Sequence, residues 1–379
     1  MSKKIKSFIS IFALTAMVFI LLFISENATF TVNAAKDNVV IVLDPGHGGT
    51  GDRNLGAQYN GISEKEITLK VANYAKAYLE SFDNVTVYMT RTTDTVVSLE
   101  DRVKFAKSVN ADFMYSIHFN ASVDHDLCGS EVWVSAYDKY YENGYEFASA
   151  EVAELSKLGL YIRGIKTRLG NNGDYYGIIR HARNYDVNAV IIEHCYIDHP
   201  ADLAWIRSQA DPYQALGIAD ATAIAKYFGL KSSKLSIDYS NYKNVDVKTP
   251  TQVMANDLTA PTVCTLNSAV MNKSTGDITA SITASDPETP IIYYRYSFDG
   301  GKNWSYVVAW DHSKTTNTVV INDPSKSAAS LTIHPPAGTG QAQSAGRTDH
   351  VADRSGGLLF PLYRRADRFH RRGAQPHSL

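Results

Sequence analysis

The chain has 379 residues, of which 44% are hydrophobic and 20% charged, and this length allows two or three domains. The formal net charge of −2 excludes the strongly basic surface that general nucleic-acid binding requires. Three cysteines are too few for a disulfide-dense scaffold or a multi-cysteine zinc ribbon. We therefore expect a globular protein that has no nucleic-acid partner.

Residues 1–34 have the pattern of a secretory signal peptide. Three lysines within the first six residues precede an apolar run from Phe8 to Ile24, and small residues around Ala34 suit a signal-peptidase site. The alternative is an uncleaved membrane anchor, for which the apolar run is short. In both cases we expect the rest of the chain to lie outside the cytoplasm.

Residues 35–229 alternate strands with helices, and they form the first expected domain. A continuous apolar run indicates a fully buried strand, and apolar residues at helical spacing indicate amphipathic helices. These patterns predict strands over 39–43, 85–89, 113–119, 131–136 and 189–192, and helices over 63–82, 99–108, 145–158 and 212–228. This alternation predicts an α/β domain built around a mainly parallel sheet.

Beyond residue 229 the composition changes. Residues 230–258 are polar and predict a linker, whereas residues 259–326 alternate polar and apolar residues with period 2. The second segment, with a hairpin turn at Gly300-Gly301, predicts a partial immunoglobulin-like or fibronectin-like β module. It is shorter than a complete β-sandwich, which is consistent with a truncated chain.

The C-terminal residues differ from the rest of the chain. Residues 331–379 contain seven arginines but no lysine or glutamate, and no hydrophobic period persists. One hypothesis is a basic tail that binds an acidic polymer. The other, which we favour, is a frameshifted extension that interrupted the β module. Both hypotheses predict a disordered tail over 327–379.

The first candidate functional motif is DPGHGG at residues 44–49, directly after the first buried strand. In open α/β sheets, sites form at the carboxyl ends of strands, and the glycines leave room around the imidazole of His47. The GxxxxGK[ST] phosphate-binding pattern is absent from the chain. A histidine in a turn is often only solvated, so this motif needs support from others.

Two further strands end in polar residues. Ser116, His118 and Asn120 share one face of the strand over 113–119, although a lone strand histidine is usually a satisfied core residue. Glu193 follows the buried run of 189–192, where burial raises the pKa of a carboxyl group and suits a general base. The structural alternative for Glu193 is an ion pair with an arginine. Arg91 is either a groove residue or an ion-pair partner.

Two of the predicted helices begin at serines. Ser98 is the expected N-cap of the helix over 99–108. Ser63 and Glu66 match a capping box, in which each side chain bonds the other residue's backbone N–H. This assigns a structural role to Glu66 but none to Glu64, which either complements the helix dipole or projects into a cleft beside His47.

Taken together, His47, Glu64 and His118 supply two imidazoles and one carboxylate. Such a set with one open position is typical of catalytic zinc, and Glu193 is then a spare carboxylate that can deprotonate water. The three residues lie on separate predicted elements and form no HExxH helix, so spacing by itself is weak support.

The sequence resembles the zinc-dependent N-acetylmuramoyl-L-alanine amidases of bacterial cell walls over residues 38–228. The resemblance rests on the segments IVLDPGHGG, SEKEITLKVA, VYMTRTTD, LEDRVKFAKSVNADFMYSIHFNAS and AVIIEHCYIDHPADL, which occur in the family's order. It implies an open mixed sheet of about six strands, one zinc ion bound by His47, Glu64 and His118, and Glu193 as the catalytic residue. After Glu193 the family commonly has Gly-Phe and then Ser-Asn, where this chain has Cys195-Tyr196 and Asp198-His199, and this departure leaves the shape of the substrate groove open.

The resemblance implies a monomeric enzyme, secreted to the cell wall, that cleaves the amide bond between N-acetylmuramic acid and L-alanine of peptidoglycan. A membrane contact is expected only if residues 1–34 stay uncleaved. Two other functions stay open. One is a zinc peptidase that cuts within the stem peptides, and the other is a non-enzymatic wall-binding protein, suggested by the β module and the 23 tyrosines.

Overall fold

The computed structural model of the protein describes residues 38–50, 55–123, 125–254, 260–325, 328 and 330–334. The expected signal peptide and most of the expected tail lie outside these described residues. Within them, no helix combines the length and the apolar character that crossing a bilayer requires.

A six-stranded sheet forms the centre of the first domain, in the order β4-β1-β5-β10-β6-β7. Strands β4, β1, β5 and β10 run parallel, β6 pairs antiparallel with β10, and β7 runs parallel to β6. The strand bounds are β1 Val39–Pro45, β4 Val85–Met89, β5 Phe113–Asn120, β6 Ser130–Trp133, β7 Ile162–Lys166 and β10 Ala189–Tyr196. The predicted mixed, mainly parallel sheet of about six strands is confirmed.

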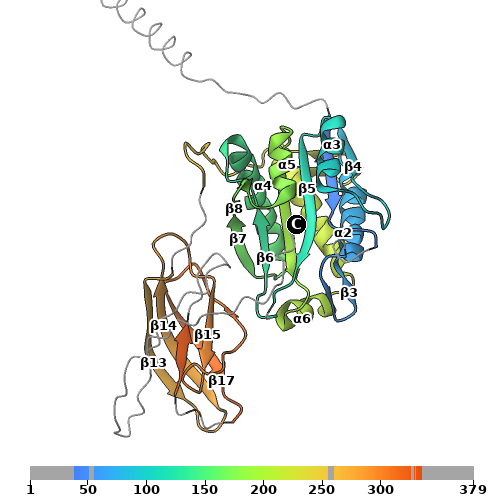
Figure 1. Ribbon diagram of the computed structural model, residues 1–379. Helices are drawn as coiled ribbons and strands as arrows, with labels where there is room; N and C mark the ends of the chain where they lie inside the picture. The colour runs from blue at the N-terminus through green and yellow to red at the C-terminus, as the bar shows by residue number, and fades with distance from the viewer. Residues whose placement is uncertain are drawn as a thin grey trace, which may run out of the picture. The chain divides into compact units, whose positions relative to one another are not determined.

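Helices cover both faces of this sheet (Figure 1). Three long helices pack into one apolar core, namely α2 Glu64–Leu79, α4 Asp138–Lys157 and α7 Pro212–Tyr227. The helices α3 Leu99–Ser108 and α5 Gly177–Asn184 pack into a second core on the other face. Helix α6 Pro200–Ser208 follows β10. The sheet is therefore the middle layer of three, as the alternation of strands and helices predicts.

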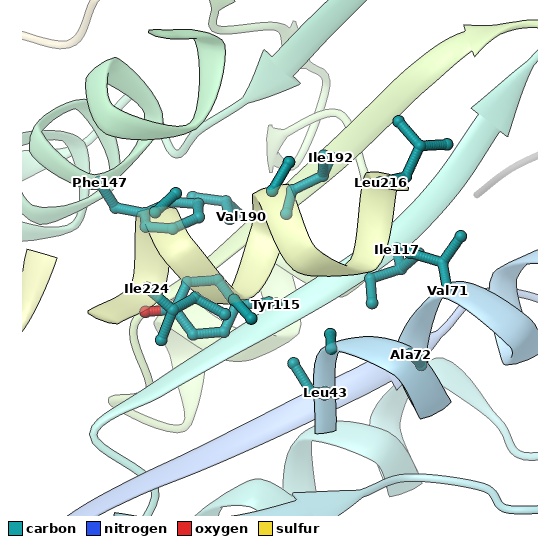
Figure 2. Close-up of a cluster of buried hydrophobic side chains, with 14 of the residues drawn as sticks. Leu43, Val71, Ala72, Tyr115, Ile117, Phe147, Val190, Ile192, Leu216 and Ile224 are labelled. Carbon is teal, nitrogen blue, oxygen red and sulfur yellow. The ribbon is translucent and has the colours of Figure 1, made fainter. Parts of the chain in front are cut away.

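The larger core lies between the sheet and α2, α4 and α7, and Figure 2 shows its centre. Tyr115 of β5 packs against Phe147 of α4, with ring centroids 4.5 Å apart. Val190 and Ile192 of β10 are fully buried in the same cluster. Removing one such side chain costs about 2–5 kcal/mol, so this core holds the strand ends in fixed positions.

Short hairpins complete the first domain, and the sequence patterns do not predict them. The pairs are β2 Gln58–Tyr59 with β3 Ile62–Ser63, β8 Leu169–Gly170 with β9 Gly173–Asp174, and β11 Lys231–Ser232 with β12 Ile237–Asp238. The last pair falls inside the range predicted as linker. Leu230 is buried there, and Leu235 and Ile237 pack against the larger core, so the packed chain extends past residue 229.

The described residues between 263 and 334 form two three-stranded antiparallel sheets around their own apolar core. One sheet contains β13 Val263–Met271, β14 Asp277–Ser285 and β17 Thr316–Asn322, and the other β15 Tyr293–Ser297, β16 Val308–Ala309 and β18 Thr332–His334. Strand β18 lies beyond residue 326, the expected end of the module. Leu331 and Ile333 are buried in this core, so the alternating pattern continues further than the sequence analysis placed it.

The two expected helix caps have different outcomes. The N-cap at Ser98 is confirmed, because its hydroxyl accepts from the Asp101 backbone N–H at 3.1 Å. The capping box at Ser63 is wrong, because Ser63 makes no side-chain cap bond and accepts instead from Gln58 Nε2 at 2.8 Å. The hairpin before α2 supplies this competing donor, which the capping motif does not reveal.

Candidate metal centre

Three elements bring His47, Glu64 and His118 together. His47 follows β1, Glu64 is the first residue of α2, and His118 lies near the end of β5. One ligand atom from each side chain lies within 4.8 Å of the other two. His47 Nε2 is 3.2 Å from Glu64 Oε2, and His118 Nδ1 is 3.0 Å from Glu64 Oε1. Residues far apart in the sequence therefore converge at the carboxyl edge of the sheet.

Glu64 is fixed from both of its oxygens. The backbone N–H of Ala57 donates to Oε2 at 2.7 Å, and that of Phe119 donates to Oε1 at 3.0 Å. Burial opposes ionisation of this carboxyl group, but the adjacent His47 and His118 outweigh it and hold its pKa well below the usual range. Burial also lowers the pKa of His118, which favours its neutral imidazole. An anionic carboxylate and a neutral imidazole are the forms that bind a metal.

Two buried arginines hold the 44–49 loop in place. Arg91 Nε donates to the Pro45 carbonyl at 2.9 Å and Nη2 to the Gly46 carbonyl at 2.8 Å. Arg102 donates to the His47 carbonyl at 2.6 Å and forms a buried ion pair with Asp44, also at 2.6 Å. Arg91 is 3% exposed and donates to backbone carbonyls, a structural role that differs from the predicted ion pair.

Two glycines leave the space that the three side chains occupy. A Cβ on Gly46 would lie 2.3–2.6 Å from ring atoms of His118. A Cβ on Gly56, whose φ is +67°, would lie 2.4 Å from Glu64 Oε2 and 2.6 Å from the His47 ring. All of these distances are shorter than the contacts that Cβ atoms make in proteins, so only glycine fits at these two positions.

Glu193 lies on β10, directly opposite His118 of β5 and Glu131 of β6 in the strand registers. Its side chain is 2% exposed, and Oε2 has no hydrogen-bond partner among the described residues. Burial, with the nearby Glu64 and Glu131 carboxylates, raises the pKa of Glu193 well above its usual value, and Arg163 only partly offsets this. No arginine of the described residues forms the ion pair considered for Glu193.

Glu131 has the opposite electrostatic environment. Its oxygens lie 3.4 Å from Arg163 Nη1 and 2.7 Å from Lys166 Nζ, and Asn120 Nδ2 donates to it at 2.9 Å. Burial disfavours its charge, yet these cations hold its pKa below the usual range. The same burial lowers the pKa of Lys166 to about 8. The sequence analysis did not single out Glu131, although a glutamate inside an apolar strand is the signal that could have identified it.

The donor set fits a zinc ion. Two imidazoles and one carboxylate are the ligands that catalytic zinc uses, with a further position left open. His47 Nε2 is buried and has no aligned hydrogen-bond partner in the described part of the chain, so it is available as a ligand. The three cysteines, Cys128, Cys195 and Cys264, form no disulfide, and Cys195 is fully buried as expected for a core thiol.

Comparison with known proteins identifies relatives of this domain. Residues 41–226 match the N-acetylmuramoyl-L-alanine amidase family, Amidase_3. The chain is 31% identical over 186 residues to N-acetylmuramoyl-L-alanine amidase LytC of Bacillus subtilis, covering 48% of this chain and 34% of LytC. It is 34% identical over 170 residues to the probable cell wall amidase LytH of Staphylococcus aureus, covering 45% of this chain and 52% of LytH.

Among solved structures, the chain is similar to the catalytic domain of CwlV, an N-acetylmuramoyl-L-alanine amidase from Bacillus (Paenibacillus) polymyxa var. colistinus. The identity is 28% and the TM-score 0.41, over 50% of this chain and 97% of that domain. The matched segment spans about half or less of LytH and LytC. Residues 41–226, which contain the strand ends and all four candidate side chains, belong to the N-acetylmuramoyl-L-alanine amidase family.

Proposed function

We propose that the protein is a secreted cell-wall hydrolase that cleaves the amide bond between N-acetylmuramic acid and L-alanine of peptidoglycan. One observation carries this proposal. His47, Glu64 and His118 converge with their ligand atoms within 4.8 Å, in a segment of an amidase family. Glu193 occupies the neighbouring strand at the register position opposite His118.

His47, Glu64 and His118 would hold one zinc ion. When bound, zinc supplies a Lewis acid and lowers the pKa of water in the site. The backbone N–H groups of Ala57 and Phe119 hold the Glu64 carboxylate in place for this role. The two arginines that bond the 44–49 loop fix the backbone of His47 in the same way.

Glu193 exchanges the proton in this proposal. It takes a proton from the attacking water and gives it to the alanine nitrogen that leaves, which completes hydrolysis of the amide. Burial raises the pKa of the Glu193 carboxyl group, so it takes up a proton more readily than an ordinary glutamate does. Arg163 and Lys166 keep Glu131 ionised, so of these two carboxyl groups Glu193 is the one that binds the proton.

The proposal extends to the setting of the enzyme. Residues 35–229 are the catalytic domain, residues 1–34 direct secretion, and peptidoglycan is the macromolecular partner. We propose a monomer that acts in the cell wall, with membrane contact only if residues 1–34 are retained. The β module is an accessory part of this enzyme.

Mass spectrometry of purified peptidoglycan digested by the zinc-loaded full chain tests this proposal. An amidase releases stem peptides with a free L-alanine amino terminus and leaves an unsubstituted lactyl group on muramic acid. New termini within the stems, with no free lactyl group, would instead identify a zinc peptidase. Binding to the wall without release of either product would identify a non-enzymatic binding protein.

A further inference from the structure

A second cluster of potential metal ligands lies inside the first domain. Glu151 of α4, His194 of β10 and Asp220 of α7 place one ligand atom each within 4.8 Å of the other two. All three residues are fully buried, at 0% exposure. Among the described residues, this cluster and the set of His47, Glu64 and His118 are the two that meet this geometric condition.

The orientation of His194 suits a metal ligand. Its Nδ1 lies 3.1 Å from the backbone carbonyl oxygen of His118, and a carbonyl only accepts, so Nδ1 carries a hydrogen. In a neutral imidazole this leaves the lone pair on Nε2, which points at Asp220 with a distance of 2.9 Å to Oδ1. Metal-ligating histidines are commonly held by such a bond from the other ring nitrogen.

The carboxylates of the cluster lack donors. Within the described chain, no N–H or O–H group donates to either oxygen of Glu151 or to Asp220 Oδ2. The carboxyl group of Asp220 lies beside that of Glu151, and two carboxylates can form a hydrogen bond with each other only if they share a proton. Burial raises the pKa of Glu151 well above its usual value, as do Asp220 and Glu154, and no cationic side chain of the described chain offsets them.

A buried, unpaired carboxylate costs several kcal/mol, so the cluster requires either bound protons or a bound cation. We propose that Glu151, His194 and Asp220 bind a second divalent transition-metal ion, which joins α4, β10 and α7. One imidazole and two carboxylates suit zinc and its first-row neighbours. Because the cluster has no exposed atom to offer a substrate, the ion has a structural role.

This site is distinct from the proposed catalytic centre but lies directly behind it. His194 follows Glu193 in β10, and its Nδ1 bonds the carbonyl of His118. The ion would therefore fix the backbone of two strands that carry residues of the catalytic centre. The proposal does not depend on the amidase activity, because it rests on the contacts of Glu151, His194 and Asp220.

Diffraction from crystals of the full chain loaded with zinc, measured at the zinc absorption edge, tests this directly. We expect an anomalous peak between Glu151, His194 and Asp220, separate from any peak at His47, Glu64 and His118. No peak at the buried cluster, with zinc present at the other site, would show that protons satisfy it and would overturn the proposal. A peak at the buried cluster without one at the other site would contradict the proposed function instead.

Metal analysis of variants provides an independent readout. Wild type is expected to hold about two zinc ions per chain, and Glu151→Gln combined with Asp220→Asn about one. The control Glu154→Gln changes a carboxylate on the same helix that is already paired with Lys157 and Lys226, and it should keep both ions. Equal zinc content in wild type and the double variant would overturn the proposal. If the double variant does not fold, the wild-type crystals decide.

Discussion

His118, a proposed zinc ligand, depends on the absence of a side chain at residue 46. Gly46 lies against its ring, and a Cβ there would come within 2.3 Å of Cε1. The loop cannot move away easily, because the Gly46 carbonyl accepts from Arg91 and from the Thr68 hydroxyl. The ring must therefore shift when residue 46 gains a side chain.

Gly46→Ala should weaken zinc binding by roughly 10–100-fold, the usual effect of disturbing groups that orient a ligand. Competition with a chromophoric chelator measures the affinity. Gly170→Ala is the control, since a Cβ there meets nothing closer than 3.3 Å. Equal affinities in the two variants would contradict the crowding argument.

Asp44 stabilises the same loop through charge. Its carboxylate lies 2.6 Å from Arg102 Nη1 and accepts from Ser116 at 2.7 Å. Asp44→Asn leaves Arg102 buried without its partner, and we expect a loss of about 3–5 kcal/mol in the free energy of unfolding. Urea denaturation measures it, with Asp238→Asn at the half-exposed Lys231 pair as a control that should lose much less.

The pH dependence of this loss has a definite sign. Burial opposes the charge of Asp44, but Arg102 and two hydroxyl groups hold its pKa below the ordinary 3.8. Its contribution is therefore complete above pH 3.8 and is lost as the pH falls through the lower folded-state value. The difference in the free energy of unfolding between wild type and Asp44→Asn should therefore narrow as the pH falls below the folded-state pKa of Asp44. A difference that does not change with pH would show that the charge of Asp44 is not its source.

At the level of whole elements, α2 and α3 begin in different ways. Ser98 caps α3 by accepting from the Asp101 N–H, whereas the Ser63 hydroxyl before α2 accepts from Gln58. Ser98→Ala should therefore cost about 1 kcal/mol of stability. Ser63→Ala should cost less, because no helix N–H loses its acceptor. Chemical denaturation of the two variants measures both losses of stability. A larger loss for Ser63→Ala than for Ser98→Ala would show that Ser63 caps α2 after all.

Elements with a strong apolar pattern could be predicted from the sequence. Strands β1, β5 and β10 are almost continuously buried, and each contains a run or an alternation of apolar residues that indicates a strand. Strand β7 has one buried residue among five, and α5 has eight residues, so neither gives a persistent period. Short or half-exposed elements are fixed by their neighbours, which a single sequence does not display.

The same distinction applies to the candidate site. His47, Glu64, His118 and Glu193 could be predicted because each is a polar residue at a helix start or strand end in a recognisable motif. Glu131 was missed because its cations, Arg163 and Lys166, come from β7, which was itself unpredicted. Glu151 and Asp220 look like ordinary helix surface residues until the packing of α4 against α7 buries them.

At the scale of the whole molecule, truncation of the C-terminal residues tests the two hypotheses for the tail, a basic segment that binds an acidic polymer and a frameshifted extension. Leu331 and Ile333 are buried in the β module, so a chain ending at residue 330 should show a lower melting temperature for that module. A chain ending at residue 334 should retain both its stability and its rate of wall hydrolysis. Loss of activity on removing residues 335–379 alone would instead support a basic tail that binds an acidic polymer. Scanning calorimetry and turbidity of wall suspensions measure the two properties.

We propose that His47, Glu64 and His118 hold the metal while Glu193 moves the proton. Measuring zinc content and wall hydrolysis in one preparation of Glu193→Gln tests this division most directly, with Glu66→Gln of the exposed α2 surface as the control. We predict that Glu193→Gln keeps its zinc and loses turnover by roughly 10²–10⁴-fold, while the control matches wild type. Hydrolysis by Glu193→Gln at the wild-type rate would show that Glu193 does not move the proton.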